Sequence, residues 1–169
     1  LDFSNVTLVG VINADTSLMI PNYKSSEDTF QLLCQVSGRS GRGEKTGTVV
    51  VQTFNPNHYA ISLVKNHDYL SFFKEEMNIR RKLGYPPYYY LVSIKVISPK
   101  YELARDESTK VANLLKEKLL SSVVLGPTVS SVFKMNNLYR FNILIKYKKE
   151  DQLYSSLEQI IEYYKIKIK

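Results

Sequence analysis

Near its N-terminus the chain has a run from Val6 to Ile12 in which every residue is apolar or β-branched except one glycine. A continuous run of this kind is typical of a strand buried on both faces of a parallel sheet, which helices must cover. A second run, TVVVQTF, follows Gly47 and ends at Asn55-Pro56, where turn residues begin. These two runs favour folds with a helix-covered parallel sheet.

Between the two runs the sequence predicts a helix over residues 26–37. Ser25 and Ser26 supply an N-terminal cap, an acidic pair occupies the first turn, and Gly38 ends the helix. Cys34 lies among apolar residues at helical spacing, so we interpret it as a small core residue. The order of strand, helix and strand predicts an α/β fold.

Gly84 and the Pro86-Pro87 pair mark a change in composition. Proline cannot continue a helix and restricts the residue before it, so the preceding helix must end here. We therefore divide the chain into a first domain over residues 1–84 and a second over residues 85–169. The helices predicted between the second run and this boundary cover residues 57–66 and 67–83.

The second domain is predicted to alternate strands and helices in the order β-α-β-β-α-β. This order is the ferredoxin-like α+β arrangement. The turn residues Asn136-Asn137 join the middle two strands as a hairpin. The elements are a strand over 90–96, a helix over 101–120, strands over 129–135 and 139–147, a helix bearing Leu153 to Tyr164, and a strand in which Ile166 and Ile168 alternate with lysines.

The content of cysteine and histidine excludes two classes of site. A single cysteine, Cys34, excludes a disulfide framework, and with only His58 and His67 as other soft ligands the chain cannot build a zinc site alone. No apolar run approaches the roughly 20 residues of a membrane span. We expect a cytoplasmic protein without a membrane segment, and the lack of an initiator methionine suggests a fragment.

The net charge of +7 increases toward the C-terminus. Lys and Arg exceed Asp and Glu by one in residues 1–84, by two in 85–130 and by four in 131–169. A basic surface attracts polyanions, so nucleic acid or an acidic partner is plausible, although a lysine-rich proteome explains the charge equally well. The cations best placed for phosphate contact surround the predicted hairpin, where the alternative is a solvated strand face: Lys134, Arg140, Lys146, Lys148 and Lys149.

The segment QVSGRSGRG, at residues 35–43, carries the strongest chemical signal. Arg39 and Arg42 are three apart and each follows a glycine, so the backbone can approach a phosphate while both guanidinium groups project toward it. Such a pair can neutralise charge that develops on a transferring γ-phosphoryl group. The alternative is a glycine-rich loop with two solvated arginines.

Gln35 stands three residues before Gly38, and the segment resembles motif VI of superfamily-two helicases, QxxGRxGR, on the second RecA-like lobe. The flanking sequences extend the likeness over essentially the whole chain. They are LDFSNVTLVGVINAD, PNY, SEDTFQLL, GTVVVQTFNPNHYAI, HDY and RRKLGYPPY. Together they resemble the primosomal protein N′ (PriA) family of replication-restart helicases.

This resemblance implies an ATP-dependent DNA helicase that translocates 3′ to 5′, recognises stalled or branched forks and restarts replication by primosome assembly. Its partners would be branched and single-stranded DNA, single-stranded DNA-binding protein, and primosome and helicase-loading proteins, in the bacterial cytoplasm at the nucleoid. ATP and Mg²⁺ would be cofactors of the full-length enzyme, and zinc would bind a region outside this chain.

The resemblance also assigns roles to individual residues. Arg39 and Arg42 would be the nucleotide-sensing and finger arginines, Gln35 and Gly38 would shape their loop, and Asp2 would belong to motif V, which couples nucleotide state to DNA grip. The sequence has no GxxxxGK[ST] loop, no acidic DExx pair and no cysteine cluster. We therefore expect residues 1–84 to be the C-terminal part of a helicase lobe, inactive alone and without a bound cofactor or metal.

Two rival functions remain open. The chain could be a non-catalytic branched-DNA or protein-docking module, or it could belong to another superfamily-two enzyme such as a branch-migration helicase. The residues that precede Leu1 in the full-length protein would distinguish the two helicase families, since a zinc-ligand region is expected there only for the primosomal protein N′ family.

Four tyrosines surround the proline pair next to the basic residues 80–82, and they have two interpretations. They could stack on unpaired bases or seal a seam between the two domains, which we favour because they fall at the boundary. The four are Tyr85, Tyr88, Tyr89 and Tyr90.

Three further polar residues are interpreted as structural. Asp15 lies at the carboxyl end of the first strand run, where the functional sites of α/β proteins are often found, but we favour the interpretation that it forms a structural turn. His58 and His67 have no Asp or Cys partner at metal spacing, so we expect caps or surface groups.

Overall fold

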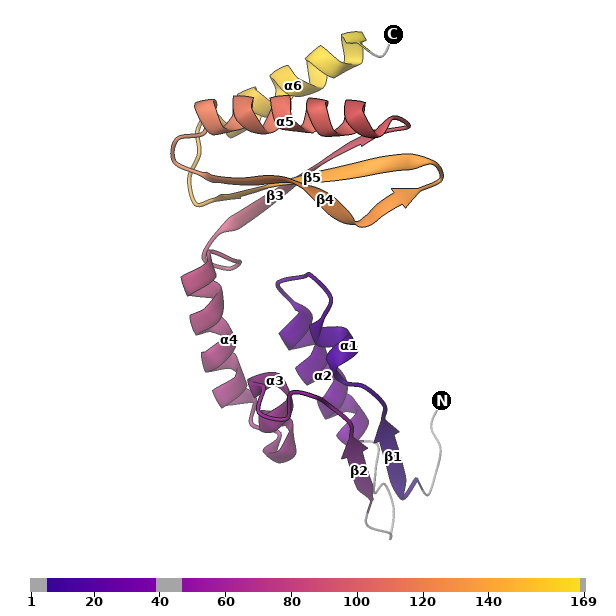
Figure 1. The fold of residues 1–169 in the computed structure, drawn as a ribbon. Coiled ribbons are helices and arrows are strands. Elements are labelled where there is room, and N and C mark those ends of the chain that lie inside the picture. The colour runs from indigo at the N-terminus through magenta and orange to yellow at the C-terminus, as the bar shows by residue number, and fades with distance from the viewer. Residues whose placement is uncertain (1–5, 39–46, 168–169) are drawn as a thin grey trace. The chain divides into compact units, whose positions relative to one another are not determined.

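A computed structural model of the chain describes residues 6–38 and 47–167. Contacts between residues divide the chain into two compact units, Leu1–Lys82 and Leu83–Lys169. Figure 1 follows the chain through both units by colour. Each unit is described by itself.

The first unit contains a parallel pair of strands and several helices, in agreement with the predicted α/β class. Strand β1 (Leu8–Val11) pairs with β2 (Thr48–Val51), with Leu8 opposite Thr48 and Val11 opposite Val51. The helical elements are α1 (Asp15–Leu18), α2 (Ser25–Ser37), α3 (Tyr59–Ser62), the 3₁₀ helix η1 (Leu63–Asn66) and α4 (Tyr69–Leu83).

The prediction that both strands are buried on both faces is wrong within this chain. Burial alternates along β1 and β2, and Leu8 and Val50 are 64% and 56% exposed. Successive strand residues point to opposite faces, and Val11 and Val51 on the other face pack against the core. Among the described residues, each apolar run therefore forms a strand with one covered face and one exposed face.

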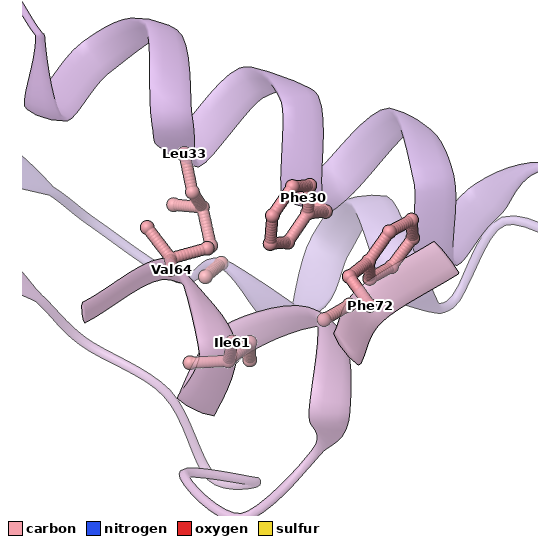
Figure 2. Packing of buried hydrophobic residues seen from close by; sticks show 7 residues of the cluster. Phe30, Leu33, Ile61, Val64 and Phe72 are labelled. Atoms are coloured by element: carbon pink, nitrogen blue, oxygen red, sulfur yellow. The ribbon is translucent and has the colours of Figure 1, made fainter. Parts of the chain in front are cut away.

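The core of the first unit lies between α2 and the helices that follow β2 (Figure 2). Phe30 and Leu33 from α2 meet Ile61 and Val64, and Phe30 stacks on Phe72 of α4 with ring centroids 4.1 Å apart. Full burial of a side chain of this size contributes about 1.5–3 kcal/mol. This cluster fixes α2, whose C-terminal end leads into the arginine-bearing segment.

The bounds of α2 agree with the prediction to within one residue, but its cap differs. Lys24 is the N-cap residue and has no capping side chain. Asn22 supplies the local bonds instead, because its Oδ1 accepts from the Lys24 N–H at 3.1 Å and its carbonyl accepts from Ser25 Oγ at 2.8 Å. The prediction that Ser25 and Ser26 cap the helix is therefore wrong, whereas Gly38 does end it.

The second unit is a three-stranded antiparallel sheet in the order β3-β5-β4. Two helices, α5 and α6, lie on the same face of this sheet (Figure 1). Leu115 and Leu119 pack against Ile143 and Ile145 of the central strand. The elements are β3 (Tyr90–Ser98), α5 (Tyr101–Lys118), β4 (Val123–Met135), β5 (Leu138–Tyr147) and α6 (Leu153–Lys167).

The predicted last strand of a ferredoxin-like domain is wrong, because Ile166 belongs to α6. The helical spacing of Leu157, Ile160 and Tyr164 holds α6 against the core, and this packing extends the helix through the residues that alternate with lysines. The described order is β-α-β-β-α, and residues 168–169 lie outside the described residues.

Strand β4 begins earlier than predicted, at Val123, so Gly126-Pro127 lies inside it rather than before it. The pairing with β5 shifts register between Leu125 and Thr128, which accommodates a proline that cannot donate to the ladder. The predicted Asn136-Asn137 turn is confirmed, and both asparagines have positive φ, as a two-residue hairpin turn requires.

Candidate nucleotide and DNA sites

The end of α2 is the part of the arginine motif that the structure describes. Gln35 lies exposed in the last turn, and the Gly38 N–H donates to the Cys34 carbonyl at 3.0 Å. Ser37 Oγ donates to the same carbonyl at 2.9 Å and lies 3.4 Å from Nε2 of His67, a contact with no sequence signal. Arg39 and Arg42, like Asp2, lie outside the described residues.

Asp15 joins the carboxyl ends of the two parallel strands. Its Oδ2 accepts from the Phe54 N–H at 2.8 Å, and its Oδ1 accepts from Asn55 Nδ2 at 2.9 Å and Thr53 Oγ1 at 3.1 Å. These bonds, led by the one from the Phe54 backbone, lower the pKa of the Asp15 carboxyl. Asp15 therefore has the structural role that the sequence favoured.

A cavity of about 370 Å³ adjoins this carboxylate. Asp15 already accepts three hydrogen bonds there, and His58 Nδ1 accepts from the Ala60 N–H at 3.2 Å as the N-cap of α3. The interpretation of His58 as a cap is thus confirmed. The lining residues are Asp15, Leu18, Met19, Phe54, Asn55 and His58.

We expect Asp15→Asn to weaken the acid sensitivity of folding. Because the pKa of Asp15 is lowered in the folded state, its carboxylate stabilises the fold above the ordinary Asp pKa, and that contribution is lost as the pH falls through the folded pKa. Urea unfolding between pH 7 and pH 3 measures this dependence. Asp28→Asn, at an exposed position on α2, is the control, and equal pH dependence in all three proteins would remove the assignment.

A buried ionic network in the first unit was not predicted. Glu76, only 3% exposed, accepts from Arg80 Nε at 2.6 Å through Oε1 and from the Tyr59 hydroxyl at 2.6 Å through Oε2. Arg80 Nη2 also donates to Glu27 at 2.7 Å. Burial, followed by the bond to Glu76, raises the pKa of Tyr59 to about 12. The spacing of four between Glu76 and Arg80 was the only signal in the sequence.

This network decides the role of two residues interpreted from the sequence. Arg80 is buried and ion-paired, so it does not join the tyrosines as a surface cation. Glu27 pairs with Arg80 in addition to lying in the first turn of α2.

The tyrosine cluster holds lysines of the second unit. Lys146 Nζ lies 3.7 Å from the ring centroid of Tyr85 and donates to the Leu83 carbonyl at 2.9 Å. Lys148 Nζ lies 4.9 Å from the ring centroid of Tyr89. The contacts given for these two rings are thus within the second unit.

The five predicted DNA-contacting cations do not share one environment. Lys146 is 9% exposed and its ammonium is engaged by Leu83 and Tyr85, whereas Lys134, Lys148 and Lys149 are exposed. Arg140 is half-buried on β5, and its Nε has no hydrogen-bond partner among the described residues.

Neither a metal cluster nor a membrane helix is found in the part of the chain that the structure describes. Residues 6–38 and 47–167 contain no group of three or more His, Cys, Asp or Glu side chains that could hold a metal ion. Within the same ranges no helix is long and apolar enough to cross a membrane.

Residues 81–167 match the family model described as the primosomal protein N C-terminal domain. Three relatives are each named replication restart protein PriA. The protein of Bacillus subtilis (strain 168) is 48% identical over 169 residues, which cover 99% of this chain and 21% of the relative. Those of Synechocystis (PCC 6803) and Thermotoga maritima are 39% and 34% identical over 95% of this chain and cover 19% and 21% of their lengths. The chain thus spans about a fifth of these relatives.

Proposed function

The chain belongs to the primosomal protein N′ (PriA) family, and from this premise we propose that it is part of an ATP-dependent 3′–5′ DNA helicase that restarts replication. The observation that carries the proposal is the match to relatives named for replication restart over almost the whole chain. The full-length protein recognises stalled or branched forks and assembles the primosome there.

In this proposal the first unit belongs to the second RecA-like lobe and supplies charge to the nucleotide. Arg39 and Arg42 stabilise the γ-phosphate in the transition state, and Gln35 and Gly38 shape the segment that carries them. Support comes from α2, which ends at Gly38. Phe30 and Leu33 of this helix are buried in the core of the first unit and hold the helix in place. Asp2 couples nucleotide state to DNA grip.

ATP and Mg²⁺ are held by parts of the full-length protein outside this chain. A phosphate cradle needs a glycine-rich loop with a lysine, and a zinc site needs several soft ligands, neither of which the sequence contains. Zinc accordingly binds elsewhere in the full-length protein.

We expect the isolated chain to have no DNA-stimulated ATPase activity, because nothing in its sequence can cradle the β- and γ-phosphates or hold Mg²⁺. Phosphate release measured with and without DNA tests this, with full-length protein as the positive control. ATP hydrolysis that copurifies with the chain through successive columns would contradict the assignment of this chain as part of a helicase that lacks the ATP-binding lobe.

The second unit binds DNA through phosphates in this proposal. Lys134, Lys148 and Lys149 are exposed, and the chain segment over 131–169 carries an excess of four positive charges. The proposed ligands are branched and single-stranded DNA, with single-stranded DNA-binding protein and helicase-loading proteins as partners at the nucleoid.

We expect Lys148→Glu with Lys149→Glu to weaken duplex binding equally for all sequences. Each lost phosphate contact removes about 0.9 from the slope of log affinity against log salt, so the slope should become shallower by about 1.8. Fluorescence anisotropy over a salt series measures it, and Lys65→Glu with Lys74→Glu, exposed in the first unit, is the control of equal charge. A native slope near zero would show that the cations are merely solvated.

A further inference from the structure

Among the described residues of the second unit, no helix lies on one face of the β3-β5-β4 sheet (Figure 1). Ile143 and Ile145 point into the core beneath α5, so the alternating residues Asn142 and Leu144 point to the opposite side. We call this side the open face. The register places Lys95 and Thr128 on either side of Asn142, with Leu125 beside Leu144.

The strands of this unit carry a net positive charge. The three strands contain four cations, Lys95, Lys134, Arg140 and Lys146, and no Asp or Glu. The acidic residues of the unit lie in the helices and one connection: Glu102, Asp106, Glu107, Glu117, Glu150, Asp151, Glu158 and Glu162. The helices are electrically balanced, with four cations and four carboxylates in α5 and two of each in α6, so the strands carry an excess of four positive charges that attracts a polyanion to the sheet.

Two of the four cations are available on the open face. Lys146 is engaged by Leu83 and Tyr85, and Lys134 lies at the far end of β4 with its Nζ over the Tyr139 ring. Lys95 is exposed and has no ion pair among the described residues, and it lies diagonally across from Arg140. Arg140 is half-buried, so part of its side chain is accessible on this face, and its buried Nε has no hydrogen-bond partner in the described ranges.

Between these cations the face offers polar donors and aliphatic surface. Ser130 donates to Asn142 Oδ1 at 2.9 Å, which orients the Asn142 amide group, and its two N–H donors have no partner among the described residues. Thr128 and Leu125 are exposed, and Leu125 is 44% exposed beside Leu144.

We propose that the open face binds an unpaired DNA strand. The phosphates contact Lys95 and Arg140, and sugars and bases lie on Leu125 and Leu144. The inference rests on the proposed DNA binding of the second unit. It adds that the open face is the binding surface and that the bound DNA is single-stranded.

A single strand fits this surface better than a duplex does. An unpaired strand presents apolar base faces along with its phosphates, and the face alternates cations with exposed aliphatic side chains. A duplex turns its base faces inward and would leave Leu125 and Leu144 without a partner. A protein partner is the competing occupant, and the experiment distinguishes it.

The test compares two charge reversals in the whole chain. Lys95→Glu with Arg140→Glu changes the open face, and Lys116→Glu with Lys165→Glu makes the same change of net charge on exposed positions of α5 and α6. Fluorescence anisotropy with a labelled 20-nucleotide oligothymidylate and with a 20-base-pair duplex is measured over a salt series. Circular dichroism melting checks folding, and Lys95→Gln with Arg140→Gln is the neutral variant if the reversal unfolds the chain.

We expect the open-face reversal to weaken oligothymidylate binding at least about tenfold and to make the salt slope shallower by about 1.4, because each phosphate contact on a single strand contributes about 0.7. The helix reversal should cost less than about threefold, since distant charges are screened. Duplex binding should fall less than oligothymidylate binding for the open-face variant.

A photo-crosslinking arm locates the strand directly. Benzoylphenylalanine at Thr128 should crosslink to oligothymidylate, and the same group at the exposed Asn113 of α5 should not. Crosslinking only from Asn113, or equal affinity losses in both reversals, overturns the proposal. If Lys148→Glu with Lys149→Glu abolishes binding while the open-face variants bind normally, the unit binds DNA elsewhere and only this inference fails. If the open-face variants instead lose a contact with another part of the full-length protein and keep DNA affinity, the face docks protein and the inference fails.

Discussion

Replacing Arg39 or Arg42 by alanine in the full-length protein is expected to lower the ATP turnover rate by roughly 10³-fold while nucleotide affinity stays nearly unchanged. A finger arginine acts on charge that is larger in the transition state than in bound ATP, so its loss raises the barrier without weakening the ground state. The rate is measured at saturating ATP and DNA, and affinity is measured separately with a fluorescent nucleotide.

Arg105→Ala is the matched control for these substitutions. Arg105 is a surface arginine of α5, ion-paired with Asp106 at 2.8 Å. Its removal should leave turnover unchanged. Native turnover in both the Arg39→Ala and the Arg42→Ala protein would remove the catalytic assignment, whereas a large loss in only one of them would assign the finger to that arginine.

The sequence predicted the bounds of helix α2, which precedes the arginines, better than it predicted the burial of strands β1 and β2. The helix over residues 26–37 is confirmed as α2 because its apolar positions face Phe72 and Val64 at helical spacing. Strand burial was wrong because an unbroken apolar run is compatible with either one or two covered faces, and only the packing partners decide between them.

The errors in the second unit have a related cause. Ile166 alternates with lysines as a strand residue would, but the stripe of Leu157, Ile160 and Tyr164 keeps the helix going through it. Tertiary packing overrides a short alternating pattern at the end of a long helix. No pattern at all identified Lys146 as a buried cation, because its partners, Leu83 and Tyr85, are more than 60 residues away in the sequence.

The ionic network of Glu27, Glu76, Arg80 and Tyr59 was also not predicted, because most of its partners are far apart in the sequence. Removing one of its members should lower the free energy of unfolding by a large amount. Arg80→Ala is expected to destabilise the chain by about 3–5 kcal/mol, because it leaves the carboxylate of Glu76 buried without its cation. The Tyr59 hydroxyl would be the one remaining donor to Glu76 among the hydrogen bonds that join these side chains. Urea unfolding of the whole chain at neutral pH measures the loss.

Two further variants separate lost charge pairing from lost packing. Lys82→Ala, at an exposed position on the same helix, should change stability by less than about 0.5 kcal/mol. Arg80→Met with Glu76→Leu removes both charges, and since a buried ion pair replaced by apolar side chains is often neutral, it should recover a large part of the stability lost in Arg80→Ala. If the double variant is as unstable as the single one, the aliphatic stem of Arg80 and its contact with the Tyr23 ring, 5.2 Å from the guanidinium carbon, stabilise the unit more than the charges do.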